Sequence, residues 1–252
     1  MLRKIIVPIV ACIVFLCLWE LLVWINGWPN YVMASPSDLP ASYIRFWDLF
    51  LVMGWQTLWR TVLGLMLAIV VGVAIGMVMG FSRTMRDALY PLLVGFNAIP
   101  KATVVPIVAL MFVGAHDFNT VLIAFMISFF PIAVSVSIGL STLEPEYRDI
   151  LRSLGASQAT IFWKIALPKT LPEFFGALKV AVTLAFIGTN LMEIVSPHGR
   201  GLGALFDSGK TNSDYPLMFA VLIALAFLGI VLYYVVVALE KIFAGWAERQ
   251  PS

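Results

Sequence analysis

The chain has 252 residues, of which 61% are hydrophobic and only 12% are charged. Because soluble domains carry roughly 25% charged residues, this composition excludes a large soluble domain and indicates a protein that crosses a membrane several times. The net charge of +2, without a basic patch of interleaved aromatic residues, argues against nucleic-acid binding. Cys12 and Cys17 lie in a first apolar run that exceeds the ~7–15 residues of a secretory signal, so neither a disulfide framework nor a cleaved leader is expected.

Apolar runs long enough to span a bilayer recur along the chain. We therefore expect an all-α polytopic membrane protein with a single transmembrane domain over residues 1–252. About six spans are expected, at residues 5–25, 57–81, 88–113, 118–140, 174–194 and 216–243. Glu20 is expected at the membrane interface. The stretch from Ala41 to Trp55 is aromatic and amphipathic, which predicts a helix along the membrane surface.

Small residues repeat at every fourth position of the second span, at Gly64, Ala68, Gly72, Gly76 and Gly80. Such a ridge allows the backbone of another helix to approach closely. We interpret it as a packing feature and not as part of a chemical site.

The third span is interrupted by Asn97-Ala-Ile-Pro-Lys101 and by Pro106. A lysine at this depth costs at least ~2.5–3.5 kcal/mol on insertion scales, and irregular backbone is tolerated there only against protein or a water-filled cavity. Two interpretations are open: the segment lines a translocation path, or Lys101 reaches the inner membrane surface. The polar residues expected along such a path are Asn97, Lys101, Ser128, Asn190 and Glu193.

Residues 144–172 form the longest interval that cannot lie in a bilayer, and apolar runs flank it. Pro145 suits a first helical turn. An apolar face then recurs at helical spacing, at Tyr147, Ile150, Leu151 and Leu154. Gly155 stands where a left-handed helix stop costs least. A short charged helix between two spans suits docking of a soluble partner; a solvated connecting loop is the alternative.

Lysine and arginine residues gather at one set of span ends, including Arg3, Lys4, Arg83, Arg86 and the interval 144–172. Cytoplasmic loops carry an excess of these residues. Both termini and the charged loop at residues 141–172 are therefore expected on the cytoplasmic side.

The spacing in this loop resembles the signature loop of ABC-importer permeases. Asp149-Ile150-Leu151, Gly155, Ile165 and Leu167-Pro168 stand in the register of Glu-Ala-Ala, Gly, Ile and Leu-Pro. The opening departs from that pattern, because Asp149 replaces the glutamate and two bulkier residues replace the alanines. Further segments resemble the nitrate, sulfonate and taurine branch of these permeases, namely residues 97–102, Glu193 with Gly201-Leu-Gly203, and residues 211–220, so the similarity runs from about Arg60 to Ala220.

The resemblance implies the permease subunit of an ATP-driven importer in the bacterial inner membrane that works by alternating access. It implies a homodimer of permeases, two cytoplasmic ATPase subunits that bind ATP and Mg²⁺, and a periplasmic or lipid-anchored substrate-binding protein. The substrate is expected to be a small anion such as a nitrate-, sulfonate- or taurine-like compound. The chain itself is expected to bind no cofactor or metal and to catalyse nothing. ATPase coupling is expected at Tyr147, Arg148, Asp149, Leu151, Arg152, Leu154, Gly155, Ala156, Ser157, Ile161 and Phe162.

Two other classes are alternatives. A secondary transporter would need intramembrane ion-binding carboxylates and usually an internal repeat, whereas a membrane scaffold would not need an interrupted third span. The stretch Ala204–Thr211 differs from a phosphate-binding P-loop at its first glycine, and no strand precedes it. We expect no nucleotide there, but an outer loop over residues 195–215 with a tight turn at Gly199–Gly203.

Overall fold

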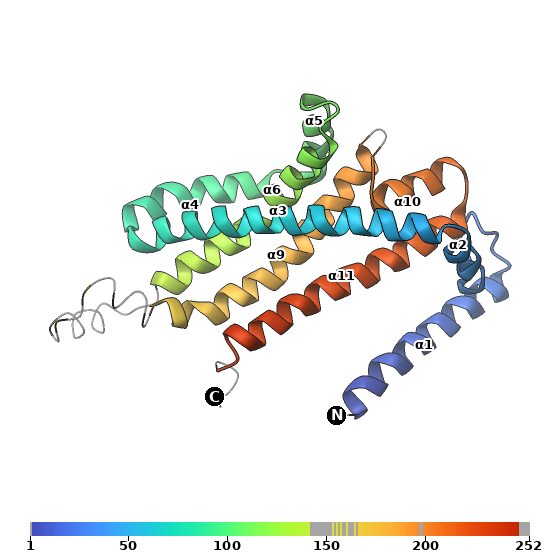
Figure 1. Cartoon of the computed structure of the whole chain (residues 1–252), viewed down its shortest axis with the longest axis horizontal. Helices are drawn as coiled ribbons and strands as arrows, with labels where there is room; N and C mark the ends of the chain where they lie inside the picture. Colours follow the sequence, from blue (N-terminus) through green and yellow to red (C-terminus); the bar gives the residue numbers. More distant parts are fainter. Residues whose placement is uncertain are drawn as a thin grey trace.

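The computed structural model describes residues 2–141, 166–196 and 199–246, with Ser153, Gly155, Ser157, Thr160 and Lys164 between them. The regular elements in this part of the chain are all helices, which confirms the predicted all-α class (Figure 1). They are α1 (Leu2–Asn26), the 3-10 helix η1 (Pro36–Asp38), α2 (Leu39–Arg45), α3 (Trp47–Phe81), α4 (Arg83–Ala98), α5 (Lys101–Met111), α6 (His116–Ser141), α9 (Leu167–Val195), α10 (Leu202–Thr211) and α11 (Tyr215–Phe243).

The pairing of α3 with α6 forms the centre of the bundle. The small-residue ridge of α3 lies directly against α6: a Cβ placed on Gly72 would lie 2.9 Å from the carbonyl oxygen of Phe129, and one on Gly76 would lie 2.7 Å from that of Ala133. Such distances leave no room for any larger side chain. The predicted role of the ridge in close helix packing is therefore confirmed.

Helix α9 packs against both α6 and α3, and α11 completes the bundle by packing against α9 and α10. Buried residues of α3, α6, α9 and α11 form one continuous core, which includes Ala68, Ile132, Ala181, Ala185 and Leu232. A second buried cluster joins the end of α1 to α2, α10 and α11 through Trp19, Leu39, Leu205 and Val221. We call the end of the bundle that holds α10 the α10 end, and the end where α3 meets α4 the α4 end (Figure 1).

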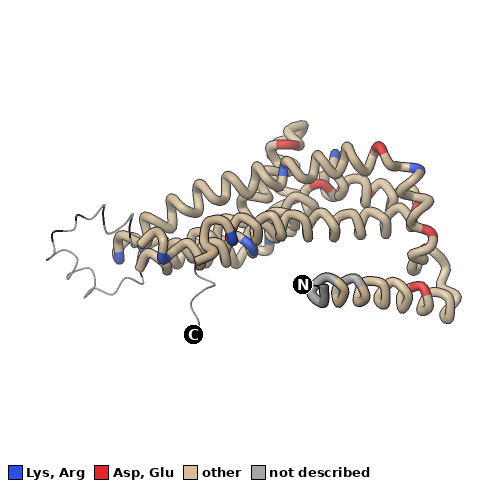
Figure 2. Tube along the Cα trace, turned by 60° about the horizontal axis from the view of Figure 1, so that its bottom comes forward, with Lys and Arg blue, Asp and Glu red and all other residues tan. Residues whose placement is uncertain are grey.

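Four described helices are long and apolar enough to cross a membrane, namely α3, α6, α9 and α11. Helices α4 and α5 pass the same test only as a pair, and they are bent by 86° at the break between them. Helix α1 adds a shorter apolar stretch, Val10–Asn26. Each predicted span overlaps one of these helices or the bent pair, but only four described helices, or five spans with the bent pair, pass the test where six were expected. Figure 2 shows long stretches of these helices without charge.

The structure corrects the boundaries of three elements. The stretch Trp47–Trp55 belongs to α3, and only α2 remains as a separate short helix before it. Helix α3 is about 52 Å long, well beyond the roughly 30 Å hydrocarbon core, so its aromatic first turns extend beyond the apolar layer. Pro168 lies in the first turn of α9, where proline is favoured, so this span starts earlier than predicted. The predicted outer loop contains α10.

Helix α1 leaves the bundle along most of its length (Figures 1 and 2). Its Trp19 and Val23 are buried, whereas most of its other described apolar side chains, such as Phe15 and Leu18, are exposed. Glu20 fastens its last turns to η1, because its carboxylate accepts hydrogen bonds from the amide of Ser37 at 3.1 Å and from the hydroxyl of Ser37 at 2.9 Å.

Candidate functional site

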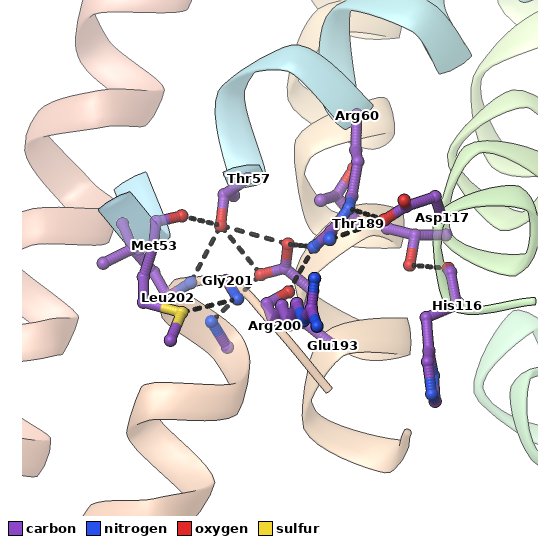
Figure 3. A network of polar contacts seen from close by, with 12 residues as sticks. Met53, Thr57, Arg60, His116, Asp117, Thr189, Glu193, Arg200, Gly201 and Leu202 are labelled. Carbon is purple, nitrogen blue, oxygen red and sulfur yellow. Dashed lines mark hydrogen bonds and ion pairs between the residues drawn. The ribbon is translucent and has the colours of Figure 1, made fainter. Parts of the chain in front are cut away.

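A buried arginine joins three helices at the α10 end of the bundle (Figure 3). The side chain of Arg60 on α3 is 3% exposed. Its guanidinium donates from Nε to Asp117 Oδ1 at 2.8 Å and from Nη1 to Glu193 Oε1 at 3.2 Å. It also donates to the carbonyl oxygen of Arg200. A single side chain thus binds the start of α6, the last turns of α9 and the turn that leads to α10.

The carboxylate of Glu193 is held from the other side by the start of α10. The side chain is 1% exposed. Its Oε2 accepts from the hydroxyl of Thr57 at 2.8 Å and from the amide of Gly203 at 3.0 Å. The amide of Leu202 donates to Thr57 Oγ1 at 2.8 Å. The first amides of a helix have no partner inside the helix, and a carboxylate at that end also complements the helix dipole.

Gly201 makes this arrangement possible. Its φ of +126° lies in a region that side chains rarely adopt, and a Cβ at this position would overlap the carboxylate of Glu193. The amide of Gly201 contacts the sulfur of Met53 at 3.1 Å. Glu193 and the turn Gly201-Leu-Gly203, which lie 8 to 10 residues apart in the sequence, therefore pack against each other. We call this cluster of Thr57, Arg60, Asp117, Glu193 and the turn the buried joint.

The sequence does not reveal that Arg60 and Asp117 belong to this joint. The available signal is the arginine itself, because a guanidinium within a long apolar helix requires carboxylate partners. Asp117 stands where a new helix begins, and its side chain is 61% exposed. Within the described residues, no group of three or more His, Cys, Asp or Glu side chains could hold a metal ion.

Two of the other residues predicted along a path lie within helix packing. Ser128 is fully buried, and its hydroxyl donates to the carbonyl oxygen of Ala124 in its own helix at 2.7 Å. Asn190 is half-buried, and its Nδ2 donates to the carbonyl oxygen of Phe186 at 2.7 Å. Glu193 belongs to the joint with Arg60. The structure brings none of these three together with Asn97 or Lys101.

Lys101 closes the break between α4 and α5. Its ammonium donates to the carbonyl oxygens of Phe96 at 3.2 Å, Asn97 at 2.6 Å and Ile99 at 3.0 Å. These carbonyls lie at the end of α4, where they have no partner in the helix. Lys101 is thus a cap of α4, a role that the two interpretations from sequence did not include.

Helix α5 separates two hollows that lie along α6 and α9. The α5–α6 cavity, of about 580 Å³, is lined by Pro106, Ala109, Leu110, Val113, Gly114, His116, Asn119, Val195 and Ser196. The α6–α9 groove, of about 660 Å³, is lined by Asn97, Phe130, Pro131, Val134, Ser135, Ile138, Glu173, Gly176, Ala177 and Val180. Between them, Val105 and Val108 of α5 pack onto Ile123, Ile127 and Met192. A solute moving along these helices therefore meets α5 as a barrier.

Most residues of the predicted coupling loop lie outside the described residues: Tyr147, Arg148, Asp149, Leu151, Arg152, Leu154, Ala156, Ile161 and Phe162. Two are described. Gly155 has a φ of +83°, the left-handed conformation that the sequence predicts. Ser157 Oγ lies 2.9 Å from Thr160 Oγ1 and accepts the amide of Thr160 at 3.2 Å. This is the pattern of a helix N-cap.

The stretch Ala204–Thr211, which resembles a P-loop, lies entirely within α10. A phosphate-binding loop presents its amides from a glycine-rich turn after a strand. Here, the amides of this stretch belong to a regular helix instead, which agrees with the sequence-based rejection of a nucleotide site.

The fold is that of a multi-pass α-helical membrane protein, by the length and composition of its helices. Residues 68–247 match the family model of the binding-protein-dependent transport system inner membrane component. The chain belongs to this family of ABC-transporter permeases. Helices α6 and α9 lie wholly within the matched region, which begins inside α3 at residue 68.

Curated relatives resemble the chain over nearly its whole length. It is 31% identical over 244 residues to the formylaminopyrimidine transport permease protein ThiX of Halalkalibacterium halodurans, covering 96% of each chain. It is 33% identical over 243 residues to the riboflavin transport system permease protein RibX of Chloroflexus aurantiacus, covering 94% of this chain and 88% of that one.

The predicted branch is also represented among the relatives. The taurine transport system permease protein TauC of Escherichia coli is 25% identical over 67% of this chain and 60% of its own. The nitrate import permease protein NrtB of a Synechocystis species is 28% identical over 61% of this chain and 54% of its own. Among solved structures, an inward-facing MetNI methionine ABC transporter shares the fold, with a TM-score of 0.65, 18% identity and coverage of 79% of this chain and 97% of that one.

Proposed function

We propose that this ABC permease forms the membrane path of an ATP-driven importer, through which a binding protein outside the membrane delivers a small solute. The observation that carries the proposal is the family match over residues 68–247, which includes the loop with the signature spacing. The same match favours an importer over a secondary transporter or a scaffold.

The proposed complex contains two permease copies, two cytoplasmic ATPase subunits and one substrate-binding protein. ATP and Mg²⁺ belong to the ATPase subunits, and this chain hydrolyses nothing. Contact with the ATPase falls on the loop at residues 141–172, where Gly155 turns the chain with positive φ. The exposed apolar side chains of α1, such as Phe15 and Leu18, supply a surface for the second copy or for lipid.

Alternating access in this complex requires a barrier that moves. We assign that role to α5, because the α5–α6 cavity and the α6–α9 groove lie on its two sides. The barrier is apolar, being formed by Val105 and Val108 against Ile127 and Met192. Closure of the ATPase subunits would move the bundle through the loop that follows α6.

For the substrate, we favour a nitrogen heterocycle over a small anion. The anion hypothesis rests on the family resemblance and on Lys101, but the ammonium of Lys101 is bound to three carbonyl oxygens. The two relatives at 31% and 33% identity are named for formylaminopyrimidine and riboflavin, which are nitrogen heterocycles. Taurine, which carries an anionic sulfonate and an ammonium group, remains the second candidate, because TauC also matches the chain.

Reconstitution tests this function. The permease is co-purified with its ATPase and placed in liposomes together with the binding protein. We expect ATP-dependent uptake of labelled formylaminopyrimidine or riboflavin, and weaker uptake of taurine. Uptake that persists without ATP, or that follows an imposed ion gradient, would point to secondary transport.

Orientation is tested separately. In a background of Cys12→Ser and Cys17→Ser, single cysteines replace Ser157 and Ser213, both exposed in the structure. An impermeant thiol reagent should label Ser157→Cys only from the cytoplasmic side and Ser213→Cys only from the opposite side. Labelling of both from one side contradicts the proposed orientation.

A further inference from the structure

Three polar side chains from three helices line the α6–α9 groove: Asn97 at the end of α4, Ser135 on α6 and Glu173 on α9. In the part of the chain that the structure describes, none of these side chains makes a hydrogen bond or ion pair with another residue. The remaining walls are apolar or small, including Val134, Gly176 and Ala177. The groove thus presents three polar side chains that bind no described residue, on an otherwise apolar surface.

Glu173 is unusual among the charges of this half of the bundle. Nearby on the same helix, Lys179 Nζ lies 2.8 Å from Glu240 Oε2 of α11, so that pair is neutral as a unit. Glu173 lies only roughly 9 Å along α9 from its first residue, and no described residue forms an ion pair or hydrogen bond with its side chain. Glu173 therefore lies near the end of its helix, just before the span predicted at residues 174–194, where a charged side chain needs water or a water-filled cavity beside it. The groove provides the cavity.

We propose that Glu173, Asn97 and Ser135 form a substrate-contact site in the α6–α9 groove that selects solutes with a cationic or N–H-donating edge. This inference rests on the proposed importer function. A carboxylate accepts two parallel N–H donors, such as the amino N–H and the protonated ring N–H of an aminopyrimidinium edge. The carboxamide of Asn97 and the hydroxyl of Ser135 each add a donor and an acceptor. The apolar wall at Phe130 and Val180 suits the flat body of a ring.

The charge of the site also disfavours anions. Glu173 is the one formally charged side chain that lines the groove in the described residues. A sulfonate or nitrate would meet like charge near a low-dielectric wall, where repulsion is stronger than in bulk water. The site is therefore expected to repel anions as well as to bind solutes with a cationic or N–H-donating edge.

The first test measures this charge without any substrate. The assembled permease–ATPase complex carries Ala177→Cys as a reporter in the groove, with Cys12→Ser and Cys17→Ser. Its rates of reaction with a cationic and an anionic methanethiosulfonate reagent are compared. We expect the cationic reagent to react faster, and Glu173→Gln to lower the ratio by about threefold to tenfold. Asp87→Asn, which removes an exposed charge outside the groove, should leave the ratio unchanged.

The second test measures selection. In proteoliposomes with the binding protein, Glu173→Gln should raise the KM for formylaminopyrimidine by about tenfold, the scale of one lost charge-assisted hydrogen bond. Glu173→Asp should retain most of the uptake. Both variants should bind the ATPase and show the same elution profile as the native complex, because Glu173 holds no other described residue in place.

Three results would overturn the proposal. The first is an unchanged reagent ratio in Glu173→Gln. The second is failure of both reagents to reach Ala177→Cys in the assembled complex, which would mean that a second permease copy covers the groove. The third is an unchanged KM, or native uptake of nitrate in preference to the heterocycles. The reagent ratio needs no transport, so loss of the importer function itself would be recognised independently by absent ATP-dependent uptake.

Discussion

Arg60 Nη1 lies 3.2 Å from Glu193 Oε1, although the two residues are 133 positions apart in the chain. Their side chains are only 3% and 1% exposed. The pair joins α3 to α9 at the end of the bundle opposite the signature loop. It is sheltered from solvent, whereas the contact of Arg60 with Asp117 is open on the carboxylate side.

The first prediction concerns this pair. Arg60→Met leaves the carboxylate of Glu193 buried without its cation, and breaking a buried ion pair typically costs about 3–5 kcal/mol. We expect a large drop in the melting temperature of the detergent-purified permease. Asp117→Asn is the matched control, because an exposed partner contributes only about 0–1 kcal/mol. If the melting temperature fell equally in the two variants, burial would not determine how much the Arg60–Glu193 ion pair stabilises the protein.

The second prediction concerns Gly201. Gly201→Ala places a Cβ on the carboxylate of Glu193 and forces an unfavourable φ. Gly114→Ala is the control, because Gly114 has a φ of +85° but nothing lies within 4 Å of its added Cβ. We expect a loss of about 1–2 kcal/mol for the control from backbone conformation alone, and a clearly larger loss for Gly201→Ala. Thermal unfolding monitored by size-exclusion fluorescence measures both, and similar curves would contradict the clash.

The third prediction concerns the α3–α6 interface. Gly76→Ala brings a methyl group to 2.7 Å from the carbonyl oxygen of Ala133, and backbone cannot move aside as a side chain can. We expect destabilisation of about 1–3 kcal/mol from overpacking. Gly95→Ala in α4 meets nothing within 4 Å and should stabilise its helix by about 0.5–1 kcal/mol. The two melting temperatures should move in opposite directions; a shift in the same direction argues against rigid packing.

The fourth prediction concerns coupling to the ATPase. Gly155 has a φ of +83° and open space around it, so a substitution there acts through the backbone. Gly155→Val should redirect the chain that follows while leaving the spans intact. We expect normal insertion, with weakened capture of the ATPase or loss of substrate-stimulated hydrolysis. Gly155→Asn should keep both, because asparagine tolerates the left-handed conformation. Full capture and stimulation by Gly155→Val would exclude a coupling role for this turn.

Much of the fold follows from local patterns in the sequence. Apolar runs locate the helices because each must match the thickness of a bilayer, and the repeat from Gly64 to Gly80 identifies a close helix contact. The beginning of α3 could not be predicted in the same way. The aromatic stretch Trp47–Trp55 satisfies the pattern of a surface helix equally well, and only tertiary contacts such as the burial of Phe50 decide that it continues into the span.

The buried joint could be predicted from the sequence less well than the helices. Glu193 stands out as a carboxylate in a span, but nothing local indicates that its partner is Arg60 on a distant helix. Lys101 shows the same limit at short range. The sequence places a cation at a helix break, yet only the 86° bend turns three carbonyl oxygens toward its ammonium. Long-range pairing and backbone direction are properties of the folded chain and leave no periodic signal.

The glycine contacts between α3 and α6 have a mechanical consequence. The backbone of α3 meets the backbone and the inner side-chain atoms of α6 there, and a close-packed interface transmits a displacement instead of absorbing it. We therefore expect α3 and α6 to move as one rigid unit. Its α4 end, at Gly80 and Leu140, adjoins the start of the signature loop, and its other end is tied by Arg60 and Asp117. We therefore expect a pull on the loop to reach the far side of the bundle in a single movement, whereas α1, α4 and α5, which pack less extensively on the bundle, are freer to move.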